Sequence, residues 1–144
     1  MTEDELRSKV IQILRTKKNI RTVRDNCSPI EYGIDIVFVE EDVFGNSRIC
    51  GVQLKTTNLR STSSRVRINV KEVIGQLAIA FGHEFPEGRL NTVYIVTTGE
   101  INSFASEYIS ECQTGFREIH LIAKEDLDRF ISLGEVELSS MEES

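Results

Sequence analysis

The sequence predicts an α/β fold in which helices flank a mixed central sheet. Helix-like and strand-like stretches follow one another as α-β-β-β-α-β and then α-β-α. Two of the strands, at 34–39 and 48–57, are joined by a turn with Gly45 and Asn46 at its tip, which is typical of an antiparallel hairpin. The later strands alternate with helices, and that order implies parallel crossovers.

The first predicted element is an amphipathic helix over 3–16. Its apolar residues recur at i, i+4, i+7 and i+8 from Leu6 to Leu14, so they form one stripe along the helix. Thr2 or Asp4 stands where a helix N-cap is expected. This helix therefore buries one face against the predicted sheet.

The middle of the chain carries the predicted strands. Residues 17–32 are polar and are expected to be irregular. The run at 34–39 is apolar and β-branched, which predicts a buried strand, and 48–57 is its hairpin partner. A polar loop follows over 58–64. Residues 65–70 alternate polar and apolar side chains, which predicts a third, half-exposed strand.

The second half of the chain repeats helix and strand. Apolar spacing predicts a helix over 73–81 and another over 104–112. Between and after them, apolar runs at 92–98 and 118–123 predict buried strands. A short helix over 127–131 closes the predicted fold.

Length and composition indicate one soluble domain. The chain has 144 residues, of which 40% are hydrophobic and 28% are charged, and we expect a single domain over 1–133 with an acidic, frayed tail over 134–144. No run of 18 apolar residues predicts a membrane span, and the acidic start does not resemble a signal peptide, so a cytoplasmic location is expected. The three cysteines, Cys27, Cys50 and Cys112, form no metal-binding motif and are expected to be reduced.

Charge is distributed unevenly along the chain. The net charge is −6, but residues 1–71 carry 13 Lys and Arg against 9 Asp and Glu, whereas 72–144 carry 4 against 14. Residues 43–71 hold six basic residues and no acidic one. A local basic segment can bind phosphates even in an acidic protein, although a solvated face explains it as well. The candidate nucleic-acid contacts are Arg60, Arg65, Arg67 and Lys71.

The predicted hairpin carries the residues that best explain a function. Asp35 is a lone carboxylate in an apolar strand, where an unpaired charge costs on the order of several kcal/mol. Gln53 and Lys55 stand two residues apart on the partner strand and therefore share a face. The alternative interpretation is a salt bridge between Asp35 and Lys55 that ties the two strands together.

This set suits hydrolysis of a phosphodiester. The Asp35 carboxylate, the side-chain oxygen of Gln53 and the main-chain carbonyl of Leu54 are hard ligands of the kind that Mg²⁺ prefers, with Mn²⁺ as an alternative. The metal would activate a water molecule, and Lys55 would orient it or neutralise the developing negative charge. Glu5, on the first helix, is a candidate outer carboxylate.

Two pairs of segments resemble a known family. YGIDIVFV followed by GVQLKTT resembles the hairpin core of PD-(D/E)xK nucleases, in the variant where Gln replaces the middle acid. YIVTTGEINSFASEYI and then REIHLIAKEDLDRFI resemble the C-terminal part of Mrr-type restriction endonuclease catalytic domains. The resemblance covers about residues 3–132. It implies a restriction-endonuclease-like αβββαβ core with a C-terminal αβα extension, and it places Asp35, Gln53 and Lys55 on the family's catalytic positions, with Glu5 or Glu3 as the helix acid.

The resemblance also implies partners and leaves alternatives open. It implies a metal-dependent DNA endonuclease used in restriction or defence. Because one active site cuts one strand, we expect a twofold homodimer, with a partner protein as a candidate source of specificity. A junction resolvase or repair nuclease of the same fold is the second interpretation. An inactive nuclease-fold module that binds DNA or protein is the third, and an interaction domain that uses the acidic second half is the fourth. Arg24, Asn26 and Gln76 are weaker candidates to reach the site.

Overall fold

A computed structural model describes residues 1–26, 33–56, 68–101, 103–111 and 118–143. The helices are α1 (Glu3–Leu14), α2 (Ile68–Gly82), α3 (Ser103–Glu111) and α4 (Lys124–Glu143). The strands are β1 (Ile20–Asp25), β2 (Ile36–Glu41), β3 (Ser47–Lys55), β4 (Glu84–Phe85), β5 (Gly88–Arg89), β6 (Thr92–Thr97) and β7 (Glu118–Ile122). None of the described helices is long and apolar enough to cross a membrane.

The central sheet is mixed, as predicted. It has five strands in the order β1-β2-β3-β6-β7, and β4 pairs with β5 in a separate small hairpin. Strands β1, β2 and β3 are antiparallel neighbours, whereas β3–β6 and β6–β7 are parallel pairs. The parallel pairs require crossovers, and α2 and α3 lie in those two connections.

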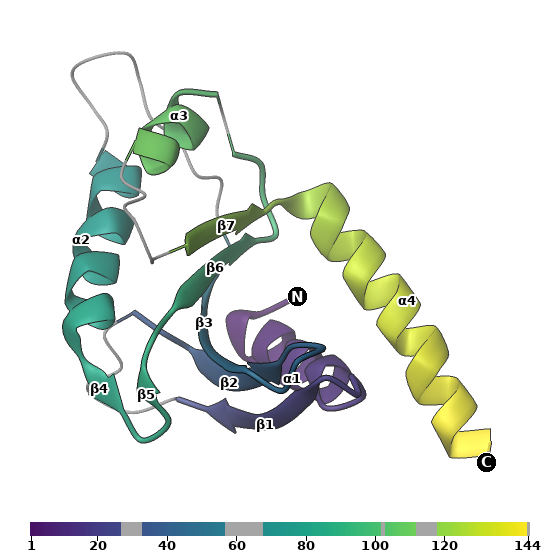
Figure 1. The fold of residues 1–144 in the computed structure, drawn as a ribbon. Coiled ribbons are helices and arrows are strands. Elements are labelled where there is room, and N and C mark those ends of the chain that lie inside the picture. Colours follow the sequence, from purple (N-terminus) through teal and green to yellow (C-terminus); the bar gives the residue numbers. More distant parts are fainter. Residues whose placement is uncertain (27–32, 57–67, 102, 112–117, 144) are drawn as a thin grey trace.

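Helices cover both faces of the sheet (Figure 1). One apolar cluster lies on the side of α2, where Leu77 packs with Val37, Val93 and Ile95. The other lies on the side of α1 and α4, and its members include Leu6, Val10, Phe38, Cys50, Val52, Leu54 and Leu127. These two sides are called the α2 face and the α1–α4 face below. Their separation follows from the strand period of two, which sends successive side chains to opposite faces.

The first helix and the hairpin confirm their predictions closely. Helix α1 begins at Glu3, and its N-cap Thr2 accepts a hydrogen bond from the Glu5 N–H at 3.1 Å. The hairpin strands β2 and β3 are antiparallel neighbours, with Gly45 at φ +82° in the turn between them. Asp35, however, lies immediately before β2 rather than inside it.

Two predictions for the antiparallel half were wrong. Residues 17–32 were expected to be irregular, yet β1 occupies Ile20–Asp25 and pairs along β2. Residues 68–70 were expected to end a third strand, yet they begin α2. Tertiary pairing stabilises the edge strand despite its polar sequence, and a helix that is packed from Val73 onward extends upstream at little cost per residue.

The expected short closing helix and frayed tail were also wrong. Helix α4 runs without a break through 134–143. A Cβ on Gly134 would lie 2.5 Å from the Ile13 side chain, so the absent side chain lets α4 pack closely on α1. Ion pairs join Lys9 to Glu135 at 3.4 Å and Lys17 to Glu137 at 3.3 Å. These contacts with α1 hold the acidic segment in a helix.

Candidate active site

Asp35 is buried at the point where β2 separates from β3. Its side chain is 4% exposed, and its carboxylate Oδ2 accepts a hydrogen bond from the Leu54 N–H at 2.7 Å. The ladder between the strands reaches Ile36 and Val52, so Leu54 lies beyond its last registered pair. The carboxylate thus takes the place of a strand carbonyl, and this charge-assisted hydrogen bond offsets part of the cost of burying it.

The backbone around Asp35 is held by the end of β1. Asn26 is buried; its N–H donates to the Asp35 carbonyl at 2.9 Å and its Nδ2 donates to the Ile34 carbonyl at 2.8 Å. Arg24 Nη1 donates to Asn26 Oδ1 at 2.7 Å, and Arg24 also forms a two-bond ion pair with Glu87 at 2.8 and 2.9 Å. Sequence reasoning gave Arg24 and Asn26 little weight, because the strand that carries Arg24 and ends next to Asn26 was not expected.

Gln53 enters the α2 face and is almost fully buried. Its Nε2 donates a hydrogen bond to Gln76 Oε1 on α2 at 2.6 Å. Among the described residues its Oε1 has no hydrogen-bond partner. A buried acceptor without a partner costs about 1–3 kcal/mol, so this oxygen is where a ligand would be bound.

A glycine makes room for this pair of amides. Gly33 has φ +74°, and a Cβ there would lie 2.9 Å from both Gln53 Nε2 and Gln76 Oε1. Both the backbone conformation and the contact exclude a larger residue. The YGIDIVFV segment therefore contributes a close backbone approach to the amides as well as the carboxylate of Asp35.

Leu54 and Lys55 end β3 with their peptide groups on opposite sides. The Lys55 carbonyl accepts from the Thr98 N–H at 3.1 Å, so it points toward the β6 side. Because neighbouring residues in a strand alternate, the Leu54 carbonyl faces the side from which its own N–H meets Asp35. Lys55 is half-buried and shares the face of Gln53. Both Asp35 and Lys55 are described, and no salt bridge joins them.

The available donors fit a hard cation. No cluster of three or more His, Cys, Asp or Glu side chains that could hold a metal occurs in the described part of the chain. A site here would instead combine the Asp35 carboxylate, the Gln53 amide oxygen and the Leu54 carbonyl. Oxygen donors of this kind suit Mg²⁺ and Mn²⁺ and do not suit zinc.

The remaining predicted residues are placed less directly. Glu5 is exposed in the first turn of α1, and its neighbour Leu6 packs in the same cluster as Leu54, on the face opposite Gln53. The Glu5 N–H donates to Thr2 Oγ1, and among the described residues no ion pair joins Glu5 to Lys55. Arg60, Arg65 and Arg67 lie outside the described residues, and Lys71 lies in the first turn of α2.

Cys50 is a core residue and not a candidate nucleophile. It is fully buried on the α1–α4 face, and burial raises the pKa of its thiol to about 12. A thiol with such a pKa stays protonated at neutral pH and is a poor nucleophile. The chemistry of the described site therefore rests on oxygen and nitrogen groups on the other face.

Comparisons with known proteins agree with the predicted family. The model of the Mrr-type catalytic domain, described as a restriction endonuclease, matches residues 1–131. The structure is similar to the MspJI restriction endonuclease in complex with a 27-mer oligonucleotide, with 17% sequence identity and a TM-score of 0.45. That match covers 93% of this chain and 28% of the MspJI chain. No curated protein sequence matches the chain significantly.

Proposed function

The chain belongs to the restriction endonuclease family of Mrr-type catalytic domains, and we propose that it is a Mg²⁺-dependent DNA endonuclease. The observation that carries the proposal is the buried Gln53 Oε1, which has no partner among the described residues. It lies on the strand whose next N–H is held by the Asp35 carboxylate. A fold that served stability alone would gain from an apolar residue at this position.

The proposed ligands are the Asp35 carboxylate, the Gln53 amide oxygen and the Leu54 carbonyl. A bound Mg²⁺ (or Mn²⁺) would supply a polarised phosphate and an activated water. Asp35 provides the one negative charge of this set, and its hydrogen bond to the Leu54 N–H fixes its direction. Glu5 is proposed as an outer carboxylate that reaches the site through water from the start of α1.

Lys55 is proposed to act on the scissile phosphate. Its ammonium ends a half-buried side chain on the face of Gln53, and no ion pair with Asp35 occupies it. A free ammonium can neutralise the negative charge that develops on the phosphate oxygens and can orient the attacking water. In the Gln-x-Lys pattern, Gln53 would thus bind the metal and Lys55 would act on the phosphate, both from the same face of β3.

Gln76 is proposed as a positioning residue. As an acceptor for Gln53 Nε2 it holds the amide group, whose Oε1 has no partner among the described residues. Groups that orient a metal ligand in this way commonly contribute about 10–100-fold in metal affinity or activity. The basic segment with Arg60, Arg65, Arg67 and Lys71 is proposed to contact the DNA phosphates.

Double-strand cleavage by so small a domain requires two active sites. We therefore propose a twofold homodimer, in which each copy cuts one strand, and a separate protein that supplies sequence specificity. Sedimentation with and without DNA tests the dimer, and a monomer under all conditions contradicts it.

The direct test is cleavage of plasmid, single-stranded and four-way-junction DNA with Mg²⁺, Mn²⁺ or chelator. Metal-dependent cleavage of duplex DNA by the wild type, abolished in Asp35→Ala but with an unchanged melting temperature, supports the proposal. Cleavage confined to the four-way junction would indicate a resolvase instead. DNA binding without cleavage in any metal would indicate an inactive binding module.

A further inference from the structure

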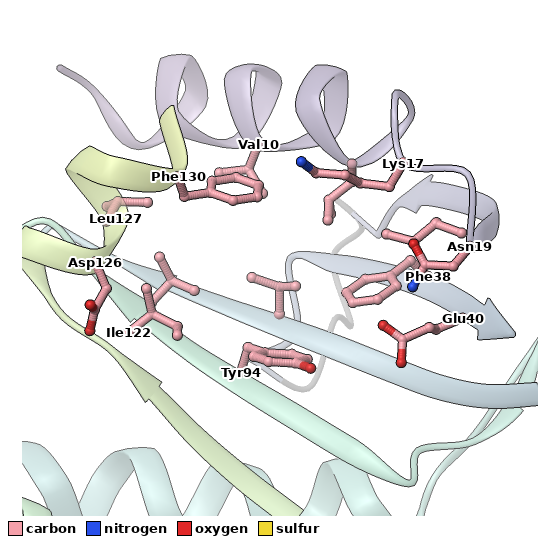
Figure 2. A pocket seen from close by; sticks show the side chains of 14 residues that line it. Val10, Lys17, Asn19, Phe38, Glu40, Tyr94, Ile122, Asp126, Leu127 and Phe130 are labelled. Atoms are coloured by element: carbon pink, nitrogen blue, oxygen red, sulfur yellow. The ribbon is translucent and has the colours of Figure 1, made fainter. Parts of the chain in front are cut away.

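A cavity of about 350 Å³ lies on the α1–α4 face of the sheet (Figure 2). Its floor is formed by side chains of the sheet, including Phe38, Val52 and Tyr94, and its walls come from α1 and α4. The volume falls in the range of small-molecule sites, which are about 300–1,000 Å³. Val52 opens into this cavity, whereas Gln53 enters the opposite face, so the cavity is separate from the proposed metal site.

Most of the cavity is apolar and three of its side chains are aromatic. Phe38 and Tyr94 have nearly parallel rings with centroids 6.1 Å apart. Phe130, from α4, lies across the cavity from them, beside Leu127 (Figure 2). Such a surface accepts a flat or branched apolar body, and aromatic faces also attract cations.

One end of the cavity is polar and carries an unbalanced negative charge. Figure 2 shows the Glu40 carboxylate beside the Tyr94 ring at this end. Glu40 is half-buried, and no salt bridge within the described residues involves it. Burial, together with the charge of nearby Glu40, raises the pKa of the Tyr94 phenol, so Tyr94 stays neutral and does not add charge.

The nearby cations are engaged elsewhere. Arg48 is directly across from Glu40 on β3, but its guanidinium pairs with Glu118 at 3.5 Å. Lys17 lines the cavity, but its ammonium pairs with Glu137 at 3.3 Å and lies 5.9 Å from the centre of the Phe130 ring. Asp126 also lines the cavity, and it pairs with Arg129 at 3.5 Å. Among the described residues, Glu40 is therefore the carboxylate of this apolar, aromatic cavity that has no ion pair.

We propose that this cavity binds a small organic cation, with an apolar body among the aromatic side chains and an ammonium group at Glu40. The charge favours a cation over a neutral or anionic molecule of the same shape. The apolar walls exclude a bare metal ion, which would keep its water, and the described residues there include no cluster of metal ligands. This proposal stands whether or not the chain cleaves DNA.

The test uses three probes of one shape and different charge: phenethylammonium, phenethyl alcohol and phenylpropionate. We expect saturable binding of the ammonium, at least about tenfold tighter than the alcohol, with no binding of the acid. Amide chemical shifts should change along β2, β6 and α4 and stay constant around Gln76. Equal binding of alcohol and ammonium, changes elsewhere in the chain, or no saturable binding of the ammonium would overturn the proposal.

Variants locate the charge. Glu40→Gln should remove the preference for the ammonium and leave binding of the alcohol unchanged. Glu41→Gln is the matched control, because Glu41 is on the same strand and pairs with Arg21 at 3.3 Å. Filling the cavity with Ile122→Trp should abolish binding of both probes. If Ile122→Trp does not fold, the comparison of Glu40→Gln with Glu41→Gln still tests the proposal. An equal preference for the ammonium over the alcohol in these two variants would overturn it.

Discussion

The two faces of strand β3, a strand of nine residues, meet different environments: a buried amide pair on one side and an apolar cluster on the other. Toward α2, Gln53 is buried with an oxygen that lacks a partner among the described residues. The Arg24–Glu87 ion pair adjoins Asn26, which bonds the backbone of Ile34 and Asp35. Toward α1 and α4, side chains of β3, including the buried thiol of Cys50, pack in an apolar cluster with Leu6. One strand can serve both roles because alternate residues face opposite environments.

Both faces bury apolar clusters, and the buried amide pair lies on the α2 face alone among the described residues of β3. The α1–α4 face buries apolar surface, which contributes about 25 cal/mol for each Å² removed from water. The α2 face includes buried polar groups whose desolvation is only partly offset, an arrangement that proteins keep at functional sites. Truncation of an apolar side chain on the α1–α4 face should therefore change the free energy of unfolding, and replacement of the buried amides on the α2 face should change cleavage.

Lys55→Ala should have the largest effect of the single substitutions that leave the proposed metal ligands in place. Loss of the ammonium removes stabilisation of the charge that develops on the phosphate, so metal-dependent cleavage should fall about 10²–10³-fold. Metal binding should persist, because Lys donates no ligand atom, and the melting temperature should stay close to that of the wild type. Single-turnover cleavage and calorimetric Mn²⁺ titration measure both. Cleavage near the wild-type rate would show that the active site lies elsewhere.

Leu6→Ala should have the largest effect on stability. Leu6 is fully buried on the α1–α4 face, and truncating such a residue costs about 2–5 kcal/mol in the free energy of unfolding. Leu133→Ala is the control, since Leu133 is 59% exposed on α4 and should cost less than about 0.5 kcal/mol. Urea unfolding measures both. If Leu6→Ala slowed cleavage by the folded protein, the proposed division between the faces would fail.

Gln76→Met should act through Gln53. Without its acceptor the Gln53 amide can rotate, and metal affinity should weaken about 10–100-fold. Gln76→Glu keeps an acceptor for Nε2 and should restore most of that affinity. A purely structural role would predict parallel losses of stability and affinity in Gln76→Met, and no rescue by the glutamate.

The double variant Gln53→Met with Gln76→Met should separate stability from function. Replacing both members of a buried pair by apolar residues of similar length is close to neutral, or stabilising by about 1 kcal/mol, because it also removes the oxygen without a partner. Cleavage should be lost. A fall in the free energy of unfolding of more than about 2 kcal/mol would mean that the amide pair stabilises the fold.

The smallest effect is a pH dependence from Glu87. Burial by itself raises the pKa of its carboxyl, but the hydrogen bond and charge of Arg24 outweigh it and lower the pKa below 4.5. Because the pKa is lower in the folded state, the ion pair stabilises the protein above about pH 4.5 and the gain disappears as pH falls through the folded-state value. Glu87→Gln should thus be less stable than wild type at pH 7, with a difference that narrows toward pH 3. A constant difference would contradict this assignment.

The sequence by itself determined the elements with strong local patterns. The apolar stripe from Leu6 to Leu14 predicted α1, and the β-branched runs predicted β2, β3, β6 and β7, since these periods arise from backbone geometry alone. The predicted hairpin also placed Asp35, which directly precedes β2, beside the strand that carries Gln53. The same segments carried the resemblance to the Mrr-type family, whose model matches the chain.

Only the tertiary structure decided the rest. Strand β1 forms because it pairs with β2 by hydrogen bonds. Helix α4 continues past Gly134 because Ile13 of α1 packs against this glycine, where a larger residue would clash. Neither contact leaves a local signal in the sequence. Two hydrogen bonds of the site, from Gln53 to Gln76 and from the Leu54 N–H to Asp35, join residues far apart along the chain. The cavity that contains Glu40 is likewise lined by distant segments. Such contacts are set by the packing of whole elements, so a pattern of neighbouring residues could not reveal them.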